Sequence, residues 1–531
     1  MACIANPVLR GFYPDPSILR VGDDYYIATS TFEWYPGVAI SHSRDLVHWR
    51  TLPPALTRSS QLDLRGRPNS GGVWAPALSH ADGLFHLIYT DVRGWAGDFK
   101  DVRNFLVTAP DIEGPWSEPV HLNNSGFDPS LFHDEDGRKW LVNMVWDHRH
   151  GHDSFGGILL QEYDPAARRL VGPVHNIFRG TALGLVEGPH LYWVDGWYYL
   201  LVAEGGTFTT HAATVARSRS IEGPYEAMPD GPLLTSAHDP SLRLQAAGHG
   251  SLVQHADGSW SLAHLCRRPL SNGRAILGRE TALQPIGWRD GWPRLAHGGQ
   301  APADQATVPD LPAQPWPQRA PRDDFEATAL APHWQAPRVP IDAAMASLDA
   351  RPGFLRLYGR ESPVSRFEQS LVACRQQAFR IEASTCVEFS PENFQQMAGL
   401  VAFYNTDAFY YLFLTRAAHS RRCLGLMRCE RGQVSYPVEK EYPFDDCARV
   451  YLRLVIDHAR IRFYCSRDGD RWQAVGWEQD ASILSDEHAL LCGFTGNFVG
   501  MACQDLSGQR LHADFDWFEY RELDEDGSAA A

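Results

Sequence analysis

Asp15-Pro16-Ser17-Ile18 opens a pattern that occurs five times in the first half of the chain. Each copy has four positions in order: a small or polar residue, a residue that is usually proline, a second small or polar residue, and an aliphatic residue. A turn and an aromatic-rich strand follow. The later copies are Ala75-Pro76-Ala77-Leu78, Asp128-Pro129-Ser130-Leu131, Gly188-Pro189-His190-Leu191 and His249-Gly250-Ser251-Leu252. Such a repeat indicates a modular fold in which each copy builds the same unit.

A turn follows each copy and leads into its second strand. The turn residues are Asp23-Asp24, Asp82-Gly83, Asp136-Gly137, Asp195-Gly196 and Asp257-Gly258. Asp-Gly between apolar runs is typical of β-hairpins, because glycine accepts the positive φ that these turns require. A period near 60 residues that contains hairpins is typical of propeller blades of about four strands. The five copies therefore predict a five-bladed β-propeller over residues 1–300.

The rest of the chain predicts a second all-β domain. Residues 301–322 are rich in proline, which favours a semi-rigid linker. Beyond them, short segments rich in Val, Tyr, Phe and Leu are closed by polar or Gly/Asp turns, and residues 513–520 alternate with the period of two that a half-buried strand has. We predict a concanavalin-like β-sandwich over residues 323–522 and a disordered tail over residues 523–531.

Three acidic residues fall where a propeller would bring them together. Asp15 and Asp128 occupy the same repeat position, and Glu187 lies one residue earlier in the fourth copy. The innermost strands line the central channel, so these carboxyl groups are expected to converge. When buried carboxylates lie close together, their charges raise the pKa of one above that of another. One group then stays protonated and another ionised at the same pH, which provides an acid and a base for acetal hydrolysis. The alternative, that Asp before Pro-Ser only caps a turn, is weakened because the acids come from separate repeats.

Other polar and aromatic residues allow two interpretations each. The rings of Phe32 and Trp74 suit the C–H faces of a sugar, but core packing is the alternative. His249, at the repeat position of Asp15, is either a substrate contact or a structural residue. The segment from Asp147 to Asp153 is rich in His and Asp, yet it lacks the spacing of a metal site, and we interpret it as a polar loop.

Composition excludes several classes of protein. The chain has 531 residues and a net charge of −16, which disfavours nucleic-acid binding. No apolar run is long enough for a membrane helix, and the start shows no secretory signal. Ten cysteines occur without a Cys-x-x-Cys pair, which favours free thiols in a reducing compartment. We therefore expect a cytoplasmic protein with no nucleic-acid or membrane partner.

Several motifs in order resemble glycoside hydrolase family 43, and within it the two-domain β-xylosidases. The motifs are Phe12-Tyr13-Pro14-Asp15-Pro16-Ser17, Thr31-Phe32-Glu33-Trp34, Gly72-Val73-Trp74-Ala75-Pro76, Gly126-Phe127-Asp128-Pro129-Ser130, Glu187-Gly188-Pro189-His190, Ala203-Glu204-Gly205-Gly206-Thr207, Leu277-Gly278-Arg279-Glu280-Thr281 and Phe494-Thr495-Gly496-Asn497-Phe498-Val499-Gly500. The resemblance spans nearly the whole chain.

The resemblance implies an inverting glycosidase on a five-bladed propeller. It makes Asp15 the general base that activates water, Glu187 the general acid, and Asp128 the residue that orients the acid and tunes its pKa. The residues that it implies for sugar binding are Phe32, Trp74, Thr207, His249, Arg279 and Phe498, the last reaching in from the second domain. Some relatives hold calcium in the channel. Because no clear oxygen cage is present, we predict catalysis without a metal or cofactor.

The expected function is release of xylose from the non-reducing end of β-1,4-xylo-oligosaccharides. An α-L-arabinofuranosidase, or an enzyme with both activities, is the alternative, since the two sugars present similar hydroxyls. A retaining fructan-processing enzyme is disfavoured because Ser17 replaces the Asn of its Asp-Pro-Asn motif. A non-catalytic carbohydrate-binding protein has no need of three converging acids. The sequence leaves the oligomeric state open, including a homo-oligomer.

Overall fold

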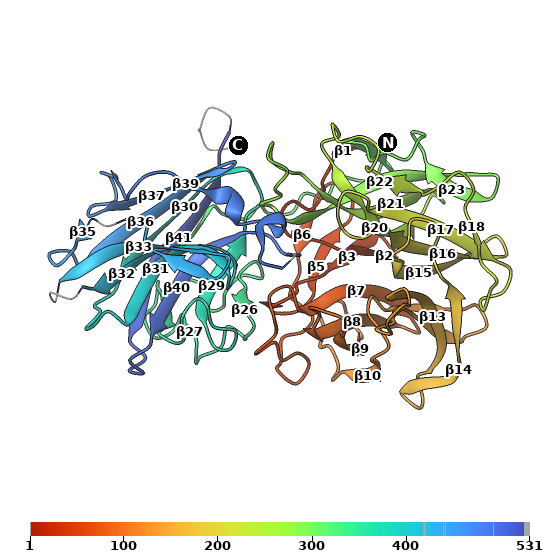
Figure 1. Ribbon diagram of the computed structural model, residues 1–531, viewed down its shortest axis with the longest axis horizontal. Coiled ribbons are helices and arrows are strands. Elements are labelled where there is room, and N and C mark those ends of the chain that lie inside the picture. Colours follow the sequence, from red (N-terminus) through yellow and green to blue (C-terminus); the bar gives the residue numbers. More distant parts are fainter. Residues whose placement is uncertain (1, 418–420, 439, 441, 492, 525–531) are drawn as a thin grey trace.

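The computed structural model describes residues 2–417, 421–438, 440, 442–491 and 493–524, and it shows two β-rich lobes side by side (Figure 1). The red to green part of the chain forms one lobe and the blue-green to blue part forms the other, as the colours in Figure 1 show. The described residues contain no α-helix, only the two short 3₁₀ turns η1 (Ala481–Ile483) and η2 (Asp486–His488). None of the described helices has the length and apolarity needed to cross a membrane. The predicted all-β class is confirmed.

Five sheets form the first lobe, and each begins at one copy of the sequence repeat. The first blade is β2 (Ser17–Val21), β3 (Asp24–Thr29), β5 (Ala39–Ser43) and β6 (Arg50–Thr51). The second is β7 (Gly72–Ala81), β8 (Leu84–Gly94), β9 (Asp101–Ala109) and β10 (Val120–Asn123). The third is β11 (Ser130–His133), β12 (Lys139–Trp146), β13 (Phe155–Asp164) and β14 (Arg169–Phe178).

The remaining blades follow the same order. The fourth is β15 (Glu187–Val194), β16 (Trp197–Glu204), β17 (Ala212–Ser218) and β18 (Glu226–Ala227), with β19 (Leu234–Thr235) also on β17. The fifth is β20 (Gln245–Gln254), β21 (Trp260–Arg267), β22 (Arg279–Arg289) and β23 (Trp292–Leu295). The five first strands contact one another in a closed cycle, β2–β7–β11–β15–β20–β2. The predicted five-bladed propeller is confirmed.

The hairpin turns explain why the repeat is visible in the sequence. Gly83, Gly137, Gly196 and Gly258 all adopt positive φ, between 72° and 87°, a conformation that glycine adopts without steric cost. The first blade differs from the prediction. Its turn is Gly22-Asp23, because Asp24 already begins β3 and Gly22 takes the positive φ of 62°.

The ring is closed by the two ends of the propeller sequence. Strand β1 (Ala2–Ala5) pairs antiparallel with β24 (Gln305–Val308), and Leu9 forms a bridge with Thr281 of the fifth blade. Residues 305–308, predicted as linker, are thus part of this closure, because their alternate apolar side chains Ala306 and Val308 are buried against the first and fifth blades. The predicted disordered tail lies outside the described residues from residue 525 onward.

The second lobe is a sandwich of two antiparallel sheets. One sheet has the order β27 (Ala346–Ser347), β28 (Leu355–Tyr358), β41 (His512–Glu522), β30 (Arg380–Glu388), β36 (Arg449–Asp457), β37 (Arg460–Ser466) and β38 (Gln473–Ala474), with β25 (Arg322–Asp323) on β41 and β39 (Gln479–Asp480) on β37. The other has the order β29 (Ser370–Arg375), β40 (Phe498–Asp505), β31 (Gln396–Asn405), β32 (Ala408–Arg416), β33 (Arg422–Glu430) and β34 (Gln433–Ser435), with β35 (Tyr442–Pro443) on β33.

Alternation of buried and exposed residues creates the sandwich core. In β36 the side chains of Val450, Leu452, Leu454 and Ile456 are buried, and the residues between them are not fully buried. This period of two places one face of the strand against the other sheet. The predicted β-sandwich is confirmed.

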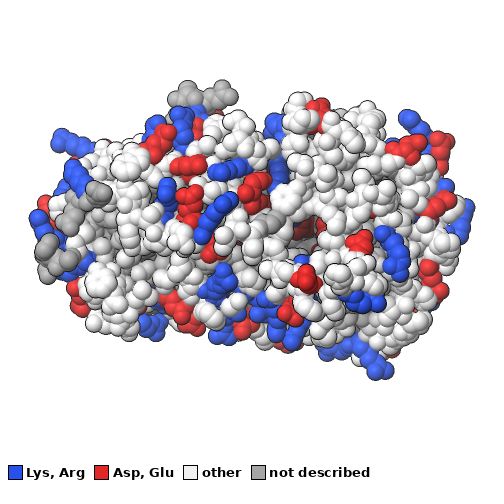
Figure 2. Space-filling view, in the orientation of Figure 1, with Lys and Arg blue, Asp and Glu red and all other residues white. Residues whose placement is uncertain are grey.

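The two lobes are joined by a shared sheet and an aromatic interface. Strand β26 (Ala336–Pro337) of the second lobe pairs with β4 (Trp34–Tyr35) of the propeller. Phe12, Trp34 and Phe498 are buried in one cluster that belongs to both lobes. Figure 2 shows a hollow on the propeller, close to this boundary, with acidic side chains inside it. The sandwich is therefore placed to contribute residues to the propeller channel.

Candidate active site

Each innermost strand begins with the same unusual backbone conformation. The residues equivalent to Asp15 all have positive φ, from 25° to 58°: Asp15, Ala75, Asp128, Gly188 and His249. A non-glycine residue with positive φ is uncommon, and such strain costs on the order of 1–3 kcal/mol at each site. Five copies of this backbone conformation around one axis, four of them at non-glycine residues, indicate that the fold uses this kink to aim side chains into the channel.

Only glycine fits this position in the fourth blade. A Cβ atom on Gly188 would lie 2.9 Å from the ring of His249, which is the equivalent residue of the fifth blade. The absence of a side chain at Gly188 leaves the preceding residue, Glu187, to face the pocket.

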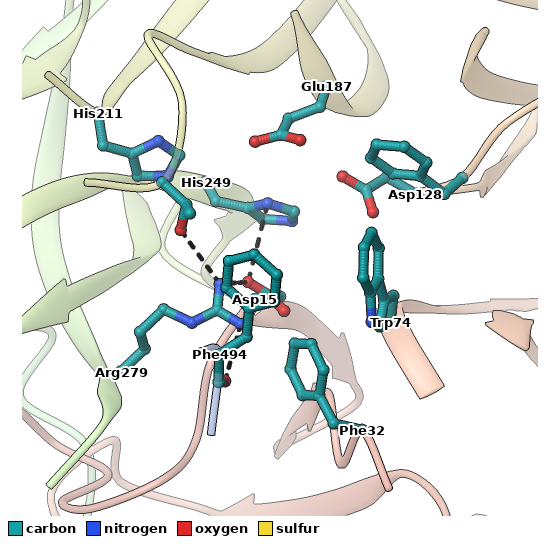
Figure 3. Close-up of a pocket in the computed structure, with 11 residues that line it drawn as sticks. Asp15, Phe32, Trp74, Asp128, Glu187, His211, His249, Arg279 and Phe494 are labelled. Carbon is teal, nitrogen blue, oxygen red and sulfur yellow. Dashed lines mark hydrogen bonds and ion pairs between the residues drawn. The ribbon is translucent and has the colours of Figure 1, made fainter. Parts of the chain in front are cut away.

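A single pocket lies where these residues meet, with about 410 Å³ of free space including its open mouth. Figure 3 shows the carboxyl groups of Asp15, Asp128 and Glu187 turned toward one space from different sides. The lining residues are Asp15, Phe32, Trp74, Phe127, Asp128, Glu187, Thr207, His211, His249, Arg279 and Phe494.

Asp15 is held in its charged form. Its two oxygens accept hydrogen bonds from Ser30 Oγ at 2.6 Å and from Arg279 Nη1 at 3.0 Å, and His249 Nδ1 lies 4.0 Å away. Burial pushes the pKa of Asp15 upward, but Arg279, His249 and Ser30 outweigh burial and bring the pKa below its ordinary value. The structure thus keeps this carboxylate ionised at neutral pH.

Glu187 and Asp128 have the opposite tendency. Burial and the negative charge of Asp15 raise the pKa of Glu187 to about 8, although Arg279 and Lys100 oppose the rise. Burial and the charge of Glu187 also raise the pKa of Asp128 well above its ordinary range. Two interacting carboxyl groups titrate together, so this pair retains a proton near neutral pH.

Aromatic rings form one wall of the pocket. Trp74 lies 6.1 Å from Phe32, 5.3 Å from Phe127 and 5.8 Å from Phe494 between ring centroids. Its indole Nε1 donates to the backbone oxygen of Ser70 at 2.8 Å, which fixes the ring. These apolar faces can pack on the C–H faces of a sugar while the acids on the other side address its oxygens.

Eight of the nine residues predicted for the site line this pocket, and Phe498 does not. Phe498 is fully buried at the start of β40, where it stacks on Trp34 with 3.6 Å between ring centroids. Phe494, in the loop before β40, lies in the pocket instead. The prediction placed the contact four residues too late because the motif does not show which of its two phenylalanines enters the strand core.

Two further lining residues were not predicted. Phe127 stands one residue before Asp128, the same repeat position that Trp74 and Glu187 occupy in their own copies. The repeat could therefore have predicted Phe127 as a pocket residue. His211 lies outside the repeat motifs, immediately before β17, and no sequence pattern indicates it. Burial lowers the pKa of His211 to about 3, so its imidazole is neutral in the pocket.

The His- and Asp-rich segment forms a polar loop rather than a cluster of ligands. Arg149 pairs with Asp147 at 2.6 Å, and His152 lies 3.3 Å from the same carboxylate. Across the described part of the chain there is no group of three or more His, Cys, Asp or Glu side chains that could hold a metal ion.

Comparison with known proteins identifies the family. Residues 4–293 match the model of glycosyl hydrolases family 43, and residues 322–521 match the beta xylosidase C-terminal concanavalin A-like domain. The chain belongs to glycosyl hydrolase family 43. The resemblance drawn from the motifs is confirmed, and this family 43 chain is a glycosidase.

Three of the proteins that this family 43 chain is similar to match it over 98% of its length. It is 48% identical to a beta-xylosidase of Bacillus subtilis, with 98% of this chain and 99% of the relative covered. It is 50% identical to the xylosidase/arabinosidase 43B of Humicola insolens, with 98% of each covered. The crystal structure of xylan beta-1,4-xylosidase from Bacillus halodurans C-125 superposes with a TM-score of 0.97 at 55% identity, covering 98% of this chain and all of the other.

Proposed function

We propose that this family 43 chain is an inverting, exo-acting β-xylosidase that releases xylose from the non-reducing end of β-1,4-xylo-oligosaccharides. One observation carries the proposal: a single small pocket holds an ionised carboxylate, Asp15, and a carboxyl pair that retains a proton, Glu187 and Asp128. The full-length similarity to proteins named as xylosidases supports the choice of sugar.

The proposed reaction uses one water molecule and two proton transfers. Asp15 takes a proton from water as the water oxygen bonds to the anomeric carbon. The bond from that carbon to the leaving oxygen breaks, and Glu187 donates its proton to this oxygen. Attack on the face opposite the leaving group inverts the anomeric centre. Exchange with solvent returns the proton from Asp15 and reprotonates Glu187.

Asp128 serves the acid in this mechanism. Its Oδ2 accepts the backbone N–H of Gly188, the residue after Glu187, at 3.1 Å. A hydrogen bond to a carboxylate favours its charged form, so we assign the shared proton to Glu187. The negative charge on Asp128 then keeps the proton on Glu187 until the leaving oxygen accepts it.

The shape of the pocket supports action at a chain end. Arg279 closes one side through its bonds to Asp15 and to the backbone oxygen of Phe494 at 3.2 Å, and Phe494 itself comes from the other lobe. A pocket closed in this way suits a terminal sugar better than the middle of a long chain. Xylotetraose labelled at its reducing end tests this proposal: labelled xylotriose is expected first, whereas early labelled xylobiose contradicts exo action.

A second activity, α-L-arabinofuranosidase, is supported by the names of three relatives, which include arabinosidase or arabinofuranosidase. The Humicola insolens protein is named a xylosidase/arabinosidase. Parallel assays with p-nitrophenyl β-xyloside and p-nitrophenyl α-L-arabinofuranoside separate a single from a dual activity. Sugar binding without hydrolysis of either glycoside would favour a non-catalytic carbohydrate-binding protein.

The cellular location and the oligomeric state of the protein stay predictions. A cytoplasmic location is tested by fractionation of cells that express the untagged chain, and a homo-oligomer is tested by light scattering of the purified protein.

A further inference from the structure

Glu33 is a buried carboxyl group that the proposed reaction does not use. Only 1% of it is exposed, and its Oε2 accepts the backbone N–H of Ser70 at 3.0 Å. Its Oε1 is buried without a hydrogen-bond partner. Burial raises the pKa of Glu33 even though Arg338 opposes the rise. Burying a carboxyl group with an unpaired oxygen is costly and calls for an explanation. The hydrogen bond from Ser70 to Glu33 points to one, because Ser70 contacts residues of the pocket.

Ser70 is bonded to the site aromatics of both lobes. Its backbone oxygen accepts the indole Nε1 of Trp74 at 2.8 Å, and its Oγ accepts the backbone N–H of Phe494 at 3.0 Å. Ser70 has a left-handed φ of 58°, which the bond from its N–H to Glu33 holds in place. One residue therefore contacts the propeller side and the sandwich side of the aromatic wall.

The residues before Ser70 are anchored to the sandwich. Arg338 donates from Nε to the backbone oxygen of Arg67 at 2.9 Å and from Nη2 to Asn69 Oδ1 at 2.8 Å. The backbone N–H of Arg338 also donates to the backbone oxygen of Glu33 at 2.8 Å. The segment that carries Ser70 is thus fixed on both sides, and Ser70 cannot shift without breaking these bonds.

Phe494 is held by the propeller at both of its backbone polar groups. Its N–H donates to Ser70 Oγ, and its carbonyl accepts Arg279 Nη2 at 3.2 Å. Its ring lies 5.8 Å from Trp74 and 6.0 Å from Phe32. The place of this ring in the pocket therefore depends on hydrogen bonds that cross the lobe boundary.

We propose that Ser70, held by Glu33, is a positioning residue that fixes Phe494 against Trp74 and so sets the width of the sugar-binding pocket. The inference rests on the proposed function only for the identity of the sugar. It assigns a role to the buried carboxyl of Glu33 and to the contact between the two lobes.

Ser70→Ala tests the proposal because it removes only the hydroxyl bond to Phe494 and leaves both backbone bonds of residue 70 possible. Alanine also tolerates the left-handed φ no worse than serine. We expect xylose binding, measured by calorimetry, to weaken about threefold to tenfold, the usual effect of losing one hydrogen bond. The KM for xylobiose should rise in parallel, while kcat changes by less than about twofold.

The double variant Ser70→Ala/Phe494→Ala shows whether Ser70 acts through the ring. If Ser70 acts through the ring, the double variant should bind xylose no more weakly than Phe494→Ala alone. Additive losses would overturn the proposal, and so would unchanged affinity in Ser70→Ala. The matched control is Ser43→Ala, which removes a buried hydroxyl that accepts the backbone N–H of Leu46 at 2.8 Å and should leave xylose affinity unchanged. Failure of the wild-type enzyme to hydrolyse xylobiose contradicts only the proposed function, since calorimetry still decides the role of Ser70.

Discussion

Two carboxyl groups in this pocket have opposite pKa shifts. Asp15 and Glu187 both lie in a water-poor site, where burial raises the pKa of each. Asp15 has Arg279 and Ser30 within hydrogen-bond distance, whereas Glu187 faces the charge of Asp15. The neighbouring charges and hydrogen bonds, rather than the residue type, therefore set the pKa of the base below that of the acid.

This separation predicts a bell-shaped pH profile of kcat/KM. The pKa of Asp15 is lowered, so the base stays ionised across the neutral range and activity falls only at pH values below the ordinary range of an aspartate. The pKa of Glu187 is about 8, so the acid is protonated below that value and activity falls as the pH rises through about 8. Rates with xylobiose from pH 3 to 10 check both limbs, and a profile flat through pH 9 would contradict the assignment of the acid.

Substitution of the two residues should give different patterns. Asp15→Asn and Glu187→Gln are each expected to lower kcat on xylobiose by at least about 10²-fold, the usual contribution of acid–base catalysis. Glu187→Gln should lose less on p-nitrophenyl xyloside, because that leaving group needs little protonation. Asp15→Asn should be impaired on both substrates, since water must be activated in each reaction. Equal losses for Glu187→Gln on the two substrates would contradict its role as acid.

At the scale of elements, serine side chains join the blades that carry the acids. Ser130 of β11 donates to the backbone oxygen of Pro189 in β15 at 2.6 Å, and Ser251 of β20 donates to the backbone oxygen of Pro16 at 2.9 Å. The serine two residues after the kink, in Asp128-Pro129-Ser130 and in His249-Gly250-Ser251, thus ties neighbouring first strands together near the axis. The motif serves both the packing of the blades and the placement of the carboxyl groups.

Ser130→Ala tests this structural role. The loss of one buried hydrogen bond should lower the free energy of unfolding by about 0.5–1.5 kcal/mol, measured by denaturant unfolding. The change also loosens the contact between the blades of Asp128 and Glu187, so a modest fall in kcat should accompany it. Unchanged stability would show that the blades do not depend on this bond.

The blades could be predicted because each one repeats the same turn and strand pattern. The kink at Asp15 and its equivalents leaves a trace in the sequence, since the short motif that follows it recurs with the period of the blade. Phe494 and His211 could not be predicted in the same way, because they enter the pocket from loops outside the repeat. Phe498 was misplaced because a strand and the loop before it both carry phenylalanine, and only tertiary packing decides which ring is buried.

At the scale of the whole molecule, the pocket belongs to both lobes. The propeller supplies the three acids, and the sandwich supplies Phe494 and the anchor Arg338. The aromatic cluster around Trp34 and Phe498 packs residues of both lobes together. The sandwich therefore completes the active site rather than only following it in the chain.

Phe494→Ala should weaken sugar binding without removing the acids. We expect xylose affinity to fall about fivefold to thirtyfold, because a ring that packs on Trp74 and on the sugar contributes on the order of 1–2 kcal/mol. Calorimetry with xylose measures the change, and the pH profile of kcat/KM should keep the same two limbs. An unchanged affinity would show that the sandwich does not contribute to the pocket.

The anomer of the xylose first released from p-nitrophenyl β-xyloside, whose only sugar is the one attacked, tests the division of roles between Asp15 and Glu187 most directly. Proton NMR of the early reaction, before mutarotation, distinguishes the two anomers. Water activated by Asp15 on the face opposite the leaving group predicts α-xylose as the first product. First release of β-xylose would contradict the account, because it requires a carboxylate that attacks the sugar instead of a water molecule.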